Sequence, residues 1–153
     1  MVNKVKYIAR AAVIASIYAA ITYFLRPLSY GPIQIRVSEA LTLLPMIETS
    51  AVPGLFVGCL IANILGGQGP WDIYGGSLIT LLAAYLTSKT NKPSLGVVPP
   101  VVLNAFGVSY YLSILYNLPY WITVLYVGIG QLISVVGLGL PLYLTLKAKY
   151  FRN

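Results

Sequence analysis

Charged side chains are so scarce in this chain that most of its surface must be apolar. Only 8% of its 153 residues are charged, whereas 58% are hydrophobic. Soluble domains carry about 25% charged residues, so a soluble fold of this composition would have too few charged groups to cover its surface. The sequence therefore predicts an all-α integral membrane protein, with residues 1–153 forming a single membrane domain.

The same composition excludes several kinds of site. The chain has no His and a single Cys, which excludes His-based and Cys-rich metal sites and the Ser-His-Asp triad. It contains no Gly-Lys dipeptide and therefore no Walker A loop for ATP. The bases do not form the aromatic-interleaved patch of a nucleic-acid-binding protein. We therefore expect no enzyme activity, metal, cofactor or nucleic-acid partner for this chain.

Apolar runs separated by prolines, glycines and bases predict a compact bundle of six membrane helices. At about 20 residues each, six helices leave only short loops. The expected helices cover residues 7–25, 36–47, 53–66, 73–87, 96–116 and 121–146. The second is too short to cross a core of about 30 Å and is partly polar, so we expect it inside the bundle beside a water-filled cavity. The loop 26–35 is expected to cover that cavity.

The distribution of bases predicts that both termini are cytoplasmic. Only Arg26 and Arg36 fall on the outer side of the predicted bundle. The other eight of the ten bases fall on the opposite side: Lys4, Lys6, Arg10, Lys89, Lys92, Lys147, Lys149 and Arg152. A cleaved signal peptide is the alternative for the first apolar run, but no small-residue cleavage site precedes Arg26.

Two of the three acids fall on the outer side, where they mark a candidate site. Glu39 lies one turn inside the second helix, and an ionisable group there usually faces the interior and has a function. Arg36 is three residues earlier on the same face, so the two side chains either close the helix end as a pair or meet a polar substrate. Asp72 is either an N-cap or a ligand contact, and Trp71 beside it is either an interfacial anchor or a stacking surface.

Amides and a tyrosine add to the candidate site. Asn63, Asn104 and Gln131 lie within the expected helices, and Tyr111 follows Asn104 by seven residues on the same face. Buried amides in membrane helices serve either as interhelical hydrogen-bond links or as ligand contacts. Together with one acid, they favour a polar ligand that is uncharged or weakly charged, and a planar ring could stack on the tyrosine.

Small residues recur every four positions along the first helix and allow another helix to approach closely. They form two adjacent rows, Ala11–Ala15–Ala19 and Ala12–Ser16–Ala20. Either packing within the bundle or docking of a partner explains them. Gly54 and Gly58 in the third helix have the same spacing, and there we expect internal packing.

Two long motifs resemble a known family. Residues 30–45 (YGPIQIRVSEALTLLP) and 53–67 (PGLFVGCLIANILGG), followed by Asp72, are similar to the signature of the QueT family. Its members are substrate-binding S components of energy-coupling factor (ECF) transporters for queuosine precursors. The resemblance implies a six-helix S-component fold in a prokaryotic cell membrane. It also implies that the protein binds its substrate from outside and docks on a transmembrane coupling protein with two ATPases. It is then thought to topple, which turns the pocket inward.

The resemblance also implies roles for residues. Arg36, Glu39 and Asn63 match motif positions, and the implied ligand is a deazaguanine such as queuine. Glu39 would accept the two adjacent N–H donors of its guanine-like edge, and Asp72 would meet a cationic substituent. Asn63, Asn104 and Gln131 would read the carbonyl and ring nitrogens, and Tyr111 or Trp71 would stack on the ring. Ala11, Ala15 and Ala19 would contact the coupling protein.

Two other functions remain open at this point. An S component for another vitamin, such as a flavin or thiamine, would have the same fold and docking. A solitary proton-coupled carrier would use Glu39 as its protonated group.

Overall fold

A computed structural model describes residues 4–30 and 34–150, leaving aside the side chain of Tyr150. The described residues are helical, with turns between the helices and no strand. Three helical spans are long and apolar enough to cross a membrane: Lys4–Phe24, Pro93–Tyr116 and Tyr120–Lys149. Large apolar side chains such as Phe24, Ile114 and Leu125 cover the outside of the bundle. An exposed apolar surface of this extent is typical of contact with lipid. The all-α class is confirmed for the described residues, and the three long apolar helices are consistent with a membrane protein.

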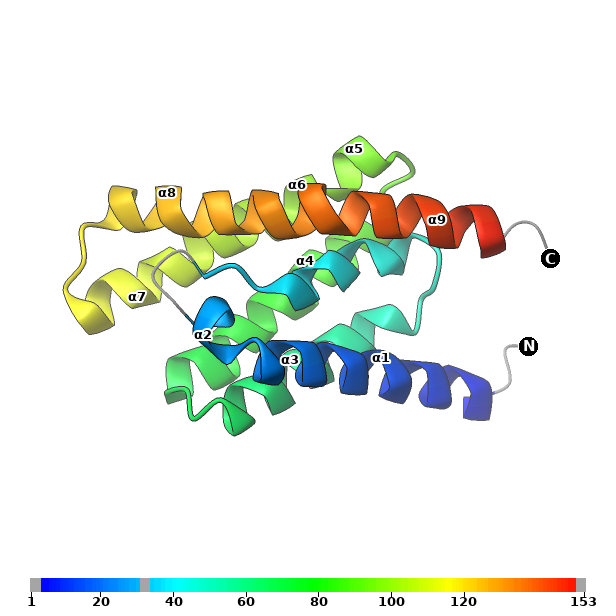
Figure 1. The fold of residues 1–153 in the computed structure, drawn as a ribbon, viewed down its shortest axis with the longest axis horizontal. Helices are drawn as coiled ribbons and strands as arrows, with labels where there is room; N and C mark the ends of the chain where they lie inside the picture. The colour runs from blue at the N-terminus through cyan, green and yellow to red at the C-terminus, as the bar shows by residue number, and fades with distance from the viewer. Residues whose placement is uncertain (1–3, 31–33, 151–153) are drawn as a thin grey trace.

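The helices follow one another with short connections (Figure 1). They are α1 (Lys4–Phe24), α2 (Arg26–Ser29), the 3-10 helix η1 (Val37–Met46), α3 (Ala51–Leu65), the π-helix η2 (Trp71–Gly76), α4 (Ser77–Ser88), α5 (Pro93–Gly96), α6 (Val98–Leu103), the π-helix η3 (Asn104–Val108), α7 (Ser109–Tyr116), α8 (Tyr120–Gln131), the π-helix η4 (Leu132–Gly139) and α9 (Leu140–Tyr150).

Helix α1 begins, and α9 ends, at the same end of the bundle (Figure 1), which we call the terminal end. The bases of α1, α9 and the α4–α5 connection lie towards this end. Helix α2, the end of α7 and the start of α8 lie at the opposite end. The expectations for Arg152 and for residues 31–33 of the 26–35 loop fall outside the described residues.

The short polar helix lies inside the bundle, as the sequence predicts. Seven of its residues are buried: Ser38, Glu39, Ala40, Leu41, Thr42, Leu43 and Pro45. Its 10 residues, at about 2.0 Å each, span about 20 Å. Close packing against η4 depends on Gly139, where an added Cβ would lie 2.9 Å from the carbonyl oxygen of Ala40. Helix η1 therefore carries its polar side chains into the centre of the bundle.

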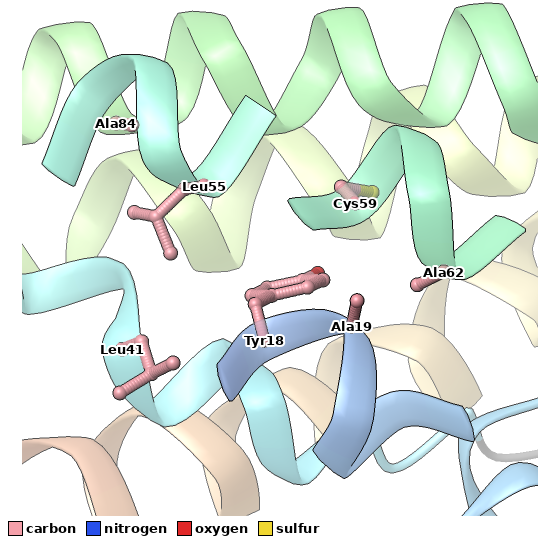
Figure 2. Packing of buried hydrophobic residues seen from close by; sticks show 7 residues of the cluster. All are labelled: Tyr18, Ala19, Leu41, Leu55, Cys59, Ala62 and Ala84. Atoms are coloured by element: carbon pink, nitrogen blue, oxygen red, sulfur yellow. The ribbon is translucent and has the colours of Figure 1, made fainter. Parts of the chain in front are cut away.

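Helices α1 and α3 approach closely enough that their backbones touch. An added Cβ at Gly54 would lie 2.8 Å from the Ala11 carbonyl oxygen, and one at Gly58 would lie 2.9 Å from that of Ala15. The internal packing expected for both glycines is confirmed. Figure 2 shows the core beside this contact, in which Tyr18 and Ala19 of α1 lie opposite Cys59 and Ala62 of α3.

The structure places the row Ala11–Ala15–Ala19, for which a docking role is expected, on the side of α1 that faces α3. Ala15 and Ala19 are buried against α3, and Ala11 is half-buried. A partner helix cannot reach Ala15 and Ala19 in this structure because α3 already covers them. The adjacent row, Ala12, Ser16 and Ala20, is exposed.

An ion pair at the terminal end ties α1 to the turn between η1 and α3. Arg10 Nη1 lies 2.6 Å from Glu48 Oε2, and the Ser50 hydroxyl and backbone N–H donate to Glu48 Oε1 at 2.9 and 3.2 Å. Partial burial raises the pKa of Glu48, but the Ser50 hydrogen bonds and Arg10 outweigh it and hold the pKa below its usual value. The ionised carboxylate therefore stabilises the fold above the unfolded-state pKa of about 4.3, and this contribution is lost as pH falls through the lower folded-state pKa.

Replacing Glu48 with Gln is expected to lower the free energy of unfolding by up to about 1 kcal/mol at pH 7, because the Arg10 partner is largely exposed. Thermal unfolding of both proteins in detergent between pH 7 and 3 measures the effect. The difference between wild type and variant should shrink below about pH 4. A difference that stays constant to pH 3 would contradict the assignment.

Candidate functional site

A buried polar cluster lies among η1, α3, η2 and α7. Arg36 Nη2 lies 3.7 Å from Asp72 Oδ1, and the Tyr111 hydroxyl donates to the same oxygen at 2.9 Å. Asn63 Nδ2 donates to the backbone carbonyl of Asp72 at 2.7 Å. Arg36 and Asp72 are each 3% exposed, and Asn63 is fully buried. Arg36 and Tyr111, far apart in the sequence, thus meet at the Asp72 carboxylate, while Asn63 holds the Asp72 backbone.

Glu39 occupies a second position in the centre of the bundle. The Tyr18 hydroxyl of α1 donates to Glu39 Oε1. Beside this pair, the hydroxyls of Thr22 and Ser38 share a hydrogen bond of 2.6 Å. Glu39 Oε2 is buried and has no hydrogen-bond partner among the described residues. Since buried polar atoms are normally paired, this oxygen is available to accept a donor.

Arg36 forms its ion pair with Asp72 rather than with Glu39. Arg36 is the N-cap of η1 with an extended backbone (φ −90°, ψ 97°), so it lies outside the helical turn that carries Glu39. Within the described residues its ion pair is with Asp72, and its guanidinium carbon lies 5.2 Å from the centre of the Tyr30 ring. Its Nε and Nη2 atoms are buried without hydrogen-bond partners. The pair that would close the helix end with Glu39 is therefore absent from the described structure.

Tyr30 lies between this cluster and the end of α3. Its hydroxyl donates to the Ala62 carbonyl at 3.0 Å or to Asn63 Oδ1 at 3.2 Å. An added Cβ at Gly66 would lie 2.8 Å from the Tyr30 ring, so glycine is needed for this close approach. Arg26 Nη2 donates to the Gly66 carbonyl at 2.7 Å. The start of the 26–35 segment is thus tied to the end of α3 at two points.

A cavity of about 410 Å³ opens beside Asp72 at the end of the bundle opposite the terminal end. Its lining combines one carboxylate, two amides, aromatic rings and aliphatic groups: Tyr30, Gln34, Gln68, Asp72, Leu112, Tyr116, Leu118 and Thr123. Small-molecule sites are typically 300–1,000 Å³ and mostly apolar, with a few polar groups. The volume and lining suit a compact, planar, polar ligand.

Of the other predicted residues, Trp71, Asn104 and Gln131 line neither the cluster nor the cavity, and Tyr111 has a different role from the one expected. The Trp71 side chain is 59% exposed and does not line this cavity. Asn104, the first residue of η3, is buried and donates to the carbonyl of Pro100 in the preceding helix α6 at 2.8 Å. Gln131 is buried, and its Oε1 has no hydrogen-bond partner among the described residues. Tyr111 contributes its hydroxyl to Asp72 rather than a stacking face.

Two tyrosines that the sequence analysis did not single out are central to the site. Tyr18 is fully buried, and a buried tyrosine hydroxyl in an apolar helix requires a partner; that requirement was a signal for a nearby polar group. Tyr30 lines the cavity and contacts Arg36, but nothing in the sequence separates it from the other aromatic residues at this end.

Comparison with known proteins gives two matches. A family model described as QueT transporter matches residues 8–148. The queuosine precursor transporter QueT of Lactococcus lactis subsp. cremoris (strain MG1363) is 35% identical to this chain over 83 residues. The aligned part is 52% of this chain and 48% of that protein, so it spans about half the length of this curated relative. No solved structure matches the chain.

Proposed function

This chain belongs to the QueT transporter family, and we propose that it captures a queuosine precursor, a deazaguanine, from outside a prokaryotic cell. In this proposal the chain is the S component of an ECF transporter. It delivers the bound molecule through a shared module of one coupling protein and two ATPases. The chain itself binds and carries, and ATP hydrolysis belongs to the partners.

The observation that carries the proposal is the Arg36–Asp72–Tyr111 cluster beside a 410 Å³ cavity. Buried ionisable groups are costly inside a membrane and usually have a function. This cluster lies at the end opposite most of the bases, which is the outer end if the positive-inside rule holds. The position supports capture from outside.

The unpaired atoms suit the edge of a guanine-like base. Such an edge has two adjacent N–H donors and a carbonyl acceptor. Glu39 Oε2 has no donor, and Arg36 Nε and Nη2 have no hydrogen-bond acceptor among the described residues, although Nη2 is in the ion pair with Asp72. To reach Glu39, which does not line the cavity, the base inserts past the Arg36–Asp72 contact. At 3.7 Å that contact is longer than a hydrogen bond, so the base breaks no hydrogen bond between the two side chains as it inserts.

Binding to the purified protein tests the proposal. The protein in lipid nanodiscs, without ATP or an ion gradient, is titrated by calorimetry with queuine, an aminomethyl deazaguanine, riboflavin and thiamine. We expect the deazaguanines to bind and the two vitamins not to bind. Tight binding of a vitamin instead would assign the S component to that vitamin. Uptake of a deazaguanine by the reconstituted protein alone, driven by a pH gradient, would favour the solitary carrier.

Docking on the coupling protein is expected on the exposed face of α1, at Ala12, Ser16 and Ala20. Small residues there let a partner helix approach closely. Replacing Ala12 and Ser16 with Trp should reduce co-purification of the coupling protein and ATPases at least tenfold and leave deazaguanine affinity within about twofold of wild type.

Gly137→Trp is the matched control for that prediction, because Gly137 is exposed on η4 with open space around it. It adds the same bulk at the lipid-facing surface of another helix and should leave the complex intact. Normal assembly of the Ala12→Trp/Ser16→Trp variant would rule out docking on this face.

A further inference from the structure

An apolar groove lies between α3 and α4, away from the candidate site. It has a volume of about 420 Å³ and is lined by Val52 of α3 and by Leu78, Leu81, Leu82 and Tyr85 of α4. From Leu78 to Tyr85 α4 makes about two turns, so the groove follows the helix for about 10 Å. Water would find almost no hydrogen-bond partner along these side chains. The groove therefore suits a hydrocarbon chain.

One end of the groove carries a positive charge. The Lys89 ammonium nitrogen lies 5.1 Å from the centre of the Tyr85 ring, which lines the groove. Lys89 is the C-cap of α4 and lies towards the terminal end, which the positive-inside rule predicts to be cytoplasmic. A hydrocarbon chain in the groove would therefore have its polar head beside this ammonium group.

No acid neutralises Lys89 among the described residues. The chain has three acids. Glu39 and Asp72 are buried in the bundle, and Glu48 pairs with Arg10. Both members of that pair line a different groove beside α1, where the two charges already balance. The exposed Lys89 side chain thus keeps its charge for an anion from outside the chain.

We propose that the groove between α3 and α4 binds one acyl chain of an anionic phospholipid of the cytoplasmic leaflet, and that Lys89 binds the phosphate of its headgroup. Bases near the cytoplasmic surface attract anionic lipids, and an ammonium group pairs well with phosphate. A zwitterionic headgroup suits Lys89 less because its own cation competes for the phosphate. The proposal depends on the membrane location of the chain and not on the transported ligand, so its failure would leave the proposed function standing.

Native mass spectrometry of the protein in detergent micelles tests the proposal, with phosphatidylglycerol and phosphatidylcholine of identical acyl chains as probes. The wild type should bind one phosphatidylglycerol at least about fivefold more tightly than one phosphatidylcholine, the factor expected for one lysine beside an anionic lipid. Lys89→Gln should bring this ratio close to one and leave the affinity for phosphatidylcholine nearly unchanged. Because Lys89 is exposed, the variant should fold.

Lys147→Gln is the matched control. The Lys147 ammonium nitrogen lies 5.6 Å from the centre of the Tyr143 ring, so the variant removes the same charge from the same kind of contact at the terminal end. Tyr143 is buried and does not line the groove. The preference for phosphatidylglycerol should therefore persist in this variant.

Leu82→Trp tests the groove itself, because the added bulk takes up space that the acyl chain needs. It should weaken both lipids about tenfold, the loss expected when about two methylene groups stay uncovered, and leave their ratio unchanged. If the variant instead keeps its lipid and loses the co-purifying coupling protein, the groove docks a partner helix and the proposal is wrong.

The wild-type ratio decides the selection for an anionic lipid even if a variant does not fold, and a ratio near one overturns it. An equal loss of the ratio in Lys89→Gln and Lys147→Gln would show attraction to the overall charge of the protein rather than to a site. An unchanged ratio in Lys89→Gln would show that another base holds the headgroup. Either result overturns the assignment to Lys89.

Discussion

Replacement of Glu39 with Gln is expected to weaken deazaguanine binding about 100-fold. Glu39 is fully buried, and Gln has nearly the same shape, so the Tyr18 hydroxyl still finds an acceptor and the fold should persist. The amide, however, accepts at one atom and donates at the other. One charge-assisted hydrogen bond is then lost and a donor faces a donor, which costs about 1.5–3 kcal/mol for each bond. Calorimetric titration of the purified variant measures the loss.

The matched control for Glu39→Gln is Glu48→Gln, which makes the same substitution at the terminal end of the bundle. Glu48 pairs with Arg10, far from the cavity beside Asp72, so this variant should bind the ligand as the wild type does. If Glu39→Gln also binds the ligand as tightly as the wild type does, Glu39 is not part of the binding site. The family assignment would not be affected.

The second large effect is expected at the contact between α1 and α3. In Gly58→Ala, the new Cβ would lie 2.8 Å from Tyr18 Cβ and 2.9 Å from the Ala15 carbonyl oxygen. Neither neighbour is the flexible end of a side chain, so the helices must move apart. Overpacking of this kind costs about 1–3 kcal/mol. Because the shift reaches Tyr18, which donates to Glu39, ligand affinity should fall together with thermal stability.

Gly137→Ala separates crowding from helix propensity. Alanine favours a helix by about 1 kcal/mol over glycine, and an added Cβ at Gly137 meets nothing within 4 Å. This variant should therefore be as stable as the wild type or slightly more stable in a detergent melt. If Gly58→Ala had the same melting temperature as Gly137→Ala, the tight α1–α3 contact would be contradicted.

The class of fold follows from the sequence because lipid tolerates few charges. Apolar runs bounded by prolines and glycines predicted helices in this chain, and the polar content of 36–47 predicted a buried helix. The 3-10 form of η1 and the π-helices η2, η3 and η4 could not be predicted. Both depend on which carbonyl each N–H reaches, and that choice is decided by contacts between helices, such as the one between Gly139 and Ala40.

The charged residues of the candidate site could be predicted from the sequence because charged residues are rare in this chain. Arg36, Glu39 and Asp72 stood out because so few ionisable groups fall outside the basic side. Which of them pair could not be predicted, because spacing along a helix suggested Arg36 with Glu39. The extended backbone of Arg36 redirects its side chain to Asp72. Which of the two small-residue rows of α1 packs against α3 could not be predicted either, because both rows have the same spacing. The structure shows that the row with Ala11 and Ala15 lies against Gly54 and Gly58 of α3.

The position of Cys59 has a practical consequence. It is the chain's single cysteine, it is fully buried, and Figure 2 shows it packed in the core between α1 and α3. Thiol-reactive dyes and spin labels therefore have no native target on the surface of the folded protein. Two cysteines introduced at exposed positions, for example one on α7 and one on α8, can be labelled in the otherwise natural sequence. The distance between the two labels would report whether the cavity changes as ligand enters.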